Sequence, residues 1–85
     1  MTPHERIVTL LTQDNCTMCD QAKDVVRRVA LDQPLSLLEV PLDSPDGREM
    51  ATRAGVLFAP GILLDGAPFG HGRLSEKKLR RALAR

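Results

Sequence analysis

The chain has 85 residues, which is enough for one domain with a small core. Hydrophobic residues make up 42% and charged residues 27%, and 12 basic against 11 acidic side chains leave a net charge of +1. This balance excludes a dedicated nucleic-acid binder, which carries a large basic excess. No secretory signal or long apolar segment is visible. We therefore expect a single domain over residues 1–85, monomeric and cytoplasmic, with no membrane partner.

The first half of the chain predicts a strand, a helix and a second strand. Ile7–Leu11 is a short apolar run with β-branched residues, which is typical of a buried strand. A helical spacing of apolar residues then predicts an inner face made of Ala22, Val25, Val26, Val29 and Ala30. The polar residues between them, Gln21, Lys23, Asp24, Arg27 and Arg28, fall on the outer side. Pro34 limits this helix, and residues 35–42 predict a second strand parallel to the first.

A short second helix is expected next. Ser44 and Pro45 are a capping hydroxyl and a proline at the first helical position, and Gly55 can end the helix. Gly47 should weaken it by about 1 kcal/mol relative to alanine, which is the reason for expecting a short helix.

The end of the chain predicts a hairpin and a last helix. Asp65-Gly66 separates the apolar runs 61–64 and 67–69, and this dipeptide favours a tight turn between two strands. Ser75 can cap a final helix whose inner side carries Leu79, Ala82 and Leu83. The predicted order is β-α-β-α-β-β-α, an α/β fold.

Cys16 and Cys19 are the only cysteines, and they lie between the first strand and the first helix. In a reducing compartment such a C-x-x-C pair is either catalytic or metal-binding rather than a permanent staple. A zinc site needs two more ligands, and the two histidines, His4 and His71, are not spaced as a pair. We therefore expect no metal site within this chain and favour a redox dithiol; two inert structural cysteines are the remaining alternative.

Ala59-Pro60, just before the third predicted strand, completes a pattern that resembles the thioredoxin fold in its minimal glutaredoxin-like form. The resemblance covers roughly residues 7–83, and the segment 70–75 is most similar to small bacterial glutaredoxin-like proteins. It implies a four-stranded mixed sheet, a cis-proline at Pro60 that faces the cysteine pair, and thiol–disulfide oxidoreductase activity in electron transport and cell redox homeostasis.

The motif Cys-Thr-Met-Cys differs from the Cys-Pro-Tyr-Cys common in glutaredoxins and the Cys-Gly-Pro-Cys of thioredoxins. The Gly-Gly and Asp that many glutaredoxins use on glutathione are also missing after the hairpin. The electron donor therefore stays open between glutathione and a flavin-dependent reductase, with no bound cofactor expected and disulfide-containing proteins as substrates. The alternative function is a carrier of a metal or iron–sulfur cluster that uses the same cysteines with a partner chain.

The start of a helix favours an anion, because its backbone N–H groups are free and its dipole is positive there. Cys16 is therefore predicted to be the nucleophile, with a thiol pKa below the ordinary value of about 8.5. The N–H groups of Met18 and Cys19 could donate to its sulfur. Cys19, one turn further on, is predicted to be more buried and to resolve the mixed disulfide.

Candidate substrate contacts are Thr17, Met18, Ala59 and Pro60. An extended substrate could pair with the backbone of Ala59 as an added strand. For Met18, a position that faces the core is the open alternative.

Overall fold

The structure is a computed structural model that describes residues 5–84. His4 lies outside the described residues. The elements are β1 (Arg6–Thr12), α1 (Thr17–Ala30), β2 (Leu35–Pro41), α2 (Pro45–Ala54), β3 (Gly61–Leu64), β4 (Ala67–His71) and α3 (Glu76–Leu83). This is the predicted order, and β4 runs two residues past the predicted end of its strand at Phe69. No helix in this part of the chain is long and apolar enough to cross a membrane.

The four strands form one mixed sheet in the order β2-β1-β3-β4, which confirms the predicted α/β class. β1 is parallel to β2, while β3 is antiparallel to both β1 and β4. Thr12 pairs with Pro41, and Leu11 pairs with Gly61. The ends of β1 and β2 therefore meet the start of β3 at one end of the sheet, and the cysteine motif follows β1 at that end.

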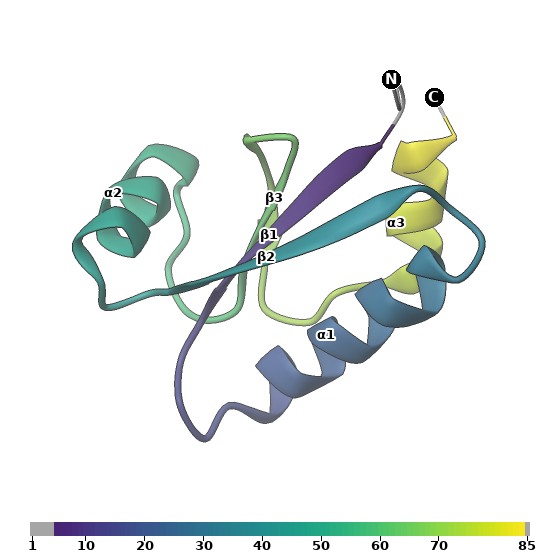
Figure 1. The fold of residues 1–85 in the computed structure, drawn as a ribbon. Helices are drawn as coiled ribbons and strands as arrows, with labels where there is room; N and C mark the ends of the chain where they lie inside the picture. Colours follow the sequence, from purple (N-terminus) through teal and green to yellow (C-terminus); the bar gives the residue numbers. More distant parts are fainter. Residues whose placement is uncertain (1–4, 85) are drawn as a thin grey trace.

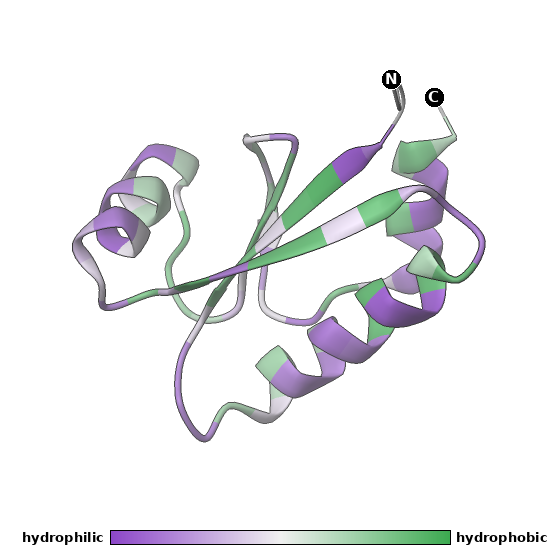
Figure 2. Cartoon of the chain, in the orientation of Figure 1, coloured by the Kyte–Doolittle hydropathy of each residue, from purple (hydrophilic) through white to green (hydrophobic). Residues whose placement is uncertain are grey.

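Helices cover the two faces of the sheet unequally, as Figure 1 shows: α1 and α3 lie together, and α2 lies apart from them. Val8 and Leu10 belong to the larger apolar cluster with α1 and α3, while Leu11 belongs to a smaller cluster with α2. The side chains of alternate residues of β1 thus pack on opposite faces of the sheet, as expected for a strand buried on both sides. In Figure 2 the strands are mainly green, with white and purple residues among them, while the helices carry more purple.

The inner face of α1 is nearly the predicted one. Ala22, Val25, Val26 and Val29 are buried, but Ala30 is exposed, because it lies at the last residue of the helix, past the core. Two residues assigned to the outer side are not fully solvated. Gln21 and Lys23 are both half-buried, and the Nε2 of Gln21 donates to the carbonyl of Leu74 at 3.3 Å.

The second helix begins and ends as predicted, with Ser44 as its N-cap and Gly55, at φ 70°, as its C-cap. The role predicted for Gly47 is wrong. Its N–H donates to the Oγ of Ser44 at 3.0 Å, and a Cβ at this position would lie 2.0 Å from the carbonyl oxygen of Pro41. Glycine is therefore required where α2 passes over the end of β2, and it is not simply a weak point of the helix.

Candidate active site

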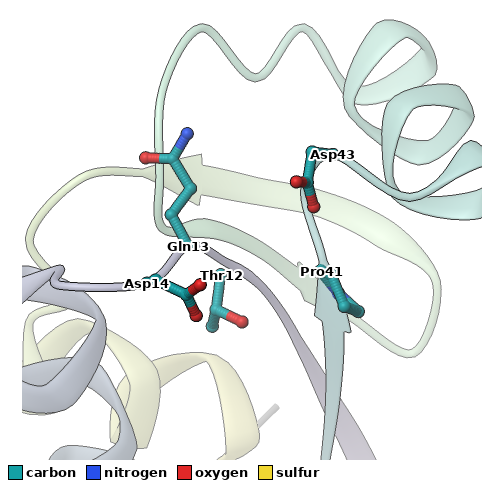
Figure 3. Close-up of a pocket in the computed structure, with 5 residues that line it drawn as sticks. All are labelled: Thr12, Gln13, Asp14, Pro41 and Asp43. Atoms are coloured by element: carbon teal, nitrogen blue, oxygen red, sulfur yellow. The ribbon is translucent and has the colours of Figure 1, made fainter.

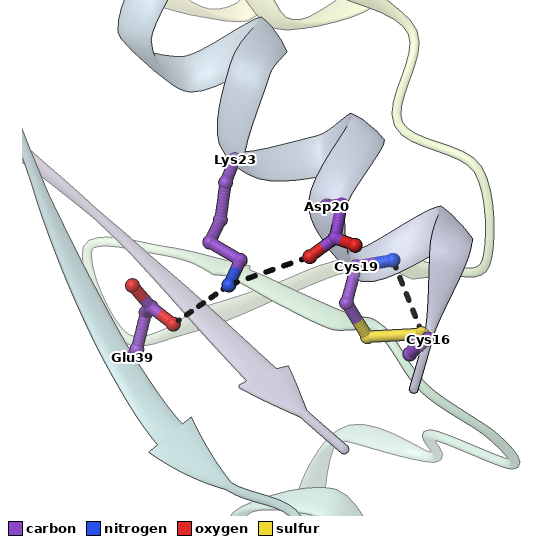
Figure 4. The surroundings of a disulfide bond; sticks show 5 residues. All are labelled: Cys16, Cys19, Asp20, Lys23 and Glu39. Carbon is purple, nitrogen blue, oxygen red and sulfur yellow. Dashed lines mark hydrogen bonds and ion pairs between the residues drawn. A yellow bond between two sulfur atoms is a disulfide. The ribbon is translucent and has the colours of Figure 1, made fainter. Parts of the chain in front are cut away.

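Cys16 is the N-cap residue of α1. Its backbone is extended, with φ −116° and ψ 103°, and its Sγ accepts a hydrogen bond from the N–H of Cys19 at 3.1 Å. The two cysteines form a disulfide, with Cα atoms 5.2 Å apart (Figure 4). Of the two N–H donors that the sequence suggested, the structure shows the one from Cys19.

The two sulfurs differ in their access to solvent. Cys16 is half-buried, whereas Cys19 is 1% exposed and belongs to the buried face of α1. A partner molecule can therefore reach only Cys16. A sulfur at the N-cap, with a backbone N–H directed at it and the positive end of the helix dipole behind it, is an environment that favours a thiolate.

The loop before β3 lies at the same end of the sheet, because Gly61 pairs with Leu11. Its Ala59–Pro60 peptide bond is cis, which confirms that prediction, and the carbonyl of Pro60 accepts a hydrogen bond from the N–H of Gly72 at 2.8 Å. Ala59 is 5% exposed, and the side chain of Pro60 is fully buried. Any contact of Ala59 and Pro60 with a substrate would therefore use their backbone.

The residues between the cysteines are on the surface. Thr17 is exposed, and Met18 is 41% exposed, so the alternative in which Met18 faces the core is wrong. The first turn of α1 thus presents an apolar side chain next to Cys16.

Two further apolar residues of this end were missed by sequence reasoning. Leu57 is 81% exposed and Phe58 is 50% exposed, in the loop that leads to Pro60. The Phe58 ring stands edge-on to His71, with centroids 4.8 Å apart, and a Cβ on Gly72 would lie 3.1 Å from it. Gly72 has φ 85°, which also favours glycine. The signal in the sequence was a pair of large apolar residues in a loop, directly before an X-Pro.

An open cavity of about 600 Å³ lies where β1 and β2 end (Figure 3). Its lining comes from the last residues of these strands and from the loops that follow them, and consists of Thr12, Gln13, Asp14, Pro41 and Asp43. Asp14 precedes Cys16 by two residues and is exposed. The two carboxylates make the cavity unfavourable for an anionic ligand.

A charged cluster lies beside the disulfide, between α1 and β2. The Nζ of Lys23 is 3.4 Å from a carboxylate oxygen of Glu39 on β2 and 3.7 Å from one of Asp20, as Figure 4 shows. The Lys23 side chain is only 24% exposed. Sequence reasoning could not find this cluster, because Glu39 and Lys23 meet only through the packing of α1 on the sheet.

Metal binding requires several ligands close together. Among residues 5–84, no group of three His, Cys, Asp or Glu side chains is arranged to hold a metal ion. His71, the histidine within this range, is the last residue of β4, and its ring lies against that of Phe58.

Comparison with solved structures identifies the class of fold. An N21Q mutant thioredoxin from Halobacterium salinarum NRC-1 superimposes with a TM-score of 0.70 and 20% identity, over 96% of this chain and 74% of that one. Fasciola hepatica thioredoxin gives 0.66 and 23% identity, over 95% and 80% of the two chains. The chain therefore has the thioredoxin fold, with a C-x-x-C pair suited to redox chemistry at the start of its first helix.

The family is also established. Residues 7–84 match the family model described as Glutaredoxin-like domain (DUF836), so the chain belongs to this family of glutaredoxin-like proteins. No curated protein sequence matches the chain.

Proposed function

We propose that this protein is a thiol–disulfide oxidoreductase that reduces protein disulfides or glutathione-mixed disulfides through Cys16 and Cys19. The observation that supports it most is the asymmetry of the pair. Cys16 is accessible and carries a hydrogen bond from the N–H of Cys19, whereas Cys19 is buried at 1% exposure. A reachable nucleophile beside a shielded second thiol is the arrangement that a two-step exchange needs.

The reaction proceeds in two displacements. The Cys16 thiolate attacks a substrate disulfide R–S–S–R′, forms Cys16–S–S–R and releases R′S⁻. The Cys19 thiolate then attacks the Cys16 sulfur, so the Cys16–Cys19 disulfide forms and RS⁻ leaves. Each leaving thiolate takes up a proton from water when its own pKa requires it. The substrate gains two electrons, and the protein is left in the oxidised form that the structure contains.

The surface around Cys16 supports a polypeptide substrate. Ala59 makes no backbone–backbone hydrogen bond within residues 5–84, so an extended segment could pair with it as an added strand. Met18, Leu57 and Phe58 supply exposed apolar area beside this position. Thr17 and the buried Pro60 would act by shaping the surface beside Cys16.

The oxidised protein must be reduced again by a donor of two electrons. Glutathione and a flavin-dependent reductase are the two candidate donors, and neither requires a cofactor bound to this chain. We propose that the protein works as a cytoplasmic monomer that turns over against such a donor.

Insulin reduction with dithiothreitol as electron donor tests the activity, and the two cysteines serve as controls for each other. Cys16→Ser should abolish turnover, because no accessible thiolate remains. Cys19→Ser should instead accumulate a mixed disulfide at Cys16, detected by intact-protein mass spectrometry. Full activity in Cys16→Ser, or no activity in the wild type, would refute the proposal.

The donor is identified in a separate experiment. The oxidised protein is offered glutathione with glutathione reductase, and thioredoxin reductase, each with NADPH. The mixture in which NADPH is consumed identifies the class of donor.

A further inference from the structure

Lys23 is a half-buried cation on the same helix as Cys19, and the two-step mechanism gives it no role. It is the least exposed charged side chain in any ion pair of the described residues, at 24%. It follows Cys19 by four residues on α1, and residues at this spacing share one face of a helix, with Cβ atoms about 5–6 Å apart. Figure 4 shows both side chains extending from α1 toward the sheet.

Two carboxylates hold the ammonium in this place. Glu39 reaches it from β2 at 3.4 Å, and Asp20 reaches it from the first turn of α1 at 3.7 Å. The pair with Glu39 joins two elements, so it restrains the lysine more than a contact within one helix would. Within the first two turns of α1 and on β2, Lys23 is the one cation.

The other elements around Cys19 offer it few charges. β1 carries no titratable side chain from Ile7 to Thr12, and the loop 56–60 carries none. The carboxylate of Glu76, at the start of α3, pairs with Arg28 in the last turn of α1 and with Arg80. It therefore lies near the end of α1 opposite to Cys19. The segments next to the motif add Asp14 before it, and His71 and Arg73 near the end of β4. Asp14, Asp20 and Glu39 all oppose a negative charge on the buried sulfur, and Lys23 offsets them.

We propose that Lys23 is a positioning residue for the resolving step: its ammonium, tethered between Glu39 and Asp20, is the counter-charge that Cys19 meets when its thiol becomes a thiolate. The inference rests on the proposed oxidoreductase function. A buried thiol ionises reluctantly, because desolvation disfavours the charged form. A nearby cation lowers this barrier, so that Cys19 can attack the Cys16 sulfur at neutral pH. Cys16 is half-buried at the N-cap, where solvent screens charges more than it does around the buried Cys19, so its own step should depend on Lys23 much less.

An aromatic disulfide such as 5,5′-dithiobis(2-nitrobenzoate) separates the two steps by stopped flow. The reduced protein releases one coloured thiolate when the mixed disulfide forms at Cys16, and a second when Cys19 displaces it. The reagent concentration is set so that the first release is faster than the second, and the two phases are then resolved. Cys19→Ser should show the first phase only.

Lys23→Met should leave the first phase within about twofold and slow the second at pH 7. A rise of one unit in the Cys19 pKa cuts the thiolate fraction about tenfold, while the more basic thiolate is about threefold more nucleophilic, so the net loss is about threefold. Above both pKa values the variant should match or exceed the wild type. The two pH profiles therefore cross, which a purely structural defect would not produce.

Glu39→Gln should change the second phase in the opposite direction, with a faster release at pH 7 and a lower pH midpoint, because it removes a negative charge and leaves Lys23.

Arg27→Met is the matched control. Arg27 lies one turn further along α1, pairs with Asp24 at 3.3 Å and is 65% exposed, so its loss should leave both phases unchanged. Lys23→Arg keeps the charge and should keep the wild-type second phase.

The outcomes distinguish this inference from the proposed function. A wild type that releases no thiolate refutes the oxidoreductase function itself. Normal exchange in the wild type, with an unchanged second phase in Lys23→Met or an equal slowing at every pH, overturns the inference alone. Should Lys23→Met not fold, Glu39→Gln still tests it, and an unchanged or slower second phase in that variant would overturn it.

Discussion

Asp65 connects the tip of the β3–β4 hairpin to the start of β1. Its φ of 52° is in the left-handed region that aspartate and asparagine tolerate better than most residues, and Gly66 follows at 83°. Its Oδ1 accepts the N–H of Ile7 at 2.8 Å, and its Oδ2 forms an ion pair with Arg6. The hydrogen bond from Ile7, followed by that from Arg6, holds the pKa of Asp65 below the ordinary value of 3.8.

Asp65→Asn should keep the turn but lose the ion pair, at a cost of about 1 kcal/mol or less, because exposed ion pairs contribute little. Since the folded-state pKa is lowered, the contribution is present above the unfolded value and is lost as the pH falls through the folded value. Urea unfolding should therefore show a difference from wild type at pH 7 that shrinks when the pH is lowered below 3.8. An equal difference at pH 7 and at the lower pH would contradict this account.

The helix α2 shows how one contact can reverse a local preference. In an isolated helix, replacing Gly47 by alanine would add about 1 kcal/mol of stability. Here the Cα of Gly47 passes so close to β2 that a Cβ would lie 2.0 Å from the carbonyl oxygen of Pro41 and 3.0 Å from the Cα of Leu42. Both neighbours are backbone atoms, so the clash cannot be relieved by a side-chain rotation.

We expect Gly47→Ala to lower the free energy of unfolding by about 1–3 kcal/mol, which is typical of overpacking that moves the backbone. Urea denaturation followed by circular dichroism measures it. Arg48→Ala, at the exposed neighbouring position, is the control and should stay within about 0.5 kcal/mol of wild type. A Gly47→Ala protein as stable as the wild type would mean that α2 can move away from β2 freely.

One sheet supplies side chains to both apolar clusters of the molecule. Leu10 contributes to the cluster under α1 and α3, and its neighbour Leu11 contributes to the cluster under α2. Leu79 joins α3 to the first cluster and is 0% exposed. Ion pairs add to this junction, because Arg80 on α3 binds Asp32 at 2.9 Å, just past the end of α1.

Leu79→Ala should cost about 2–5 kcal/mol, a large share of the roughly 5–15 kcal/mol that stabilises a domain. Because β1 is shared, we expect a single shifted transition rather than separate melting of α3. The chain has no Trp or Tyr, so circular dichroism and methyl NMR signals are the two probes. Leu31→Ala, at 85% exposure, is the control. Helix signal lost before the methyl signals of Leu63 would show that α3 unfolds alone.

Much of the fold could be predicted because its signals are local. The hydroxyls of Ser44 and Ser75 accept N–H groups of α2 and α3 as capping residues do, and Asp65-Gly66 forms the expected turn. The errors came where a residue meets a distant one. Gly47 was misjudged because Pro41 lies against it, and Lys23 was assigned to solvent because its partner Glu39 is on another element.

The sequence by itself determined the order of the elements and the chemistry of the site. Spacing of apolar residues and caps sets the helices and strands, and C-x-x-C at a helix start orders the two sulfurs by burial whatever else surrounds them. Only the tertiary structure decided what lies around that pair. The exposure of Met18, Leu57 and Phe58 follows from how their segments pack on the sheet. The Lys23–Glu39 pair depends on strand order and register, because these bring together side chains that no local pattern relates.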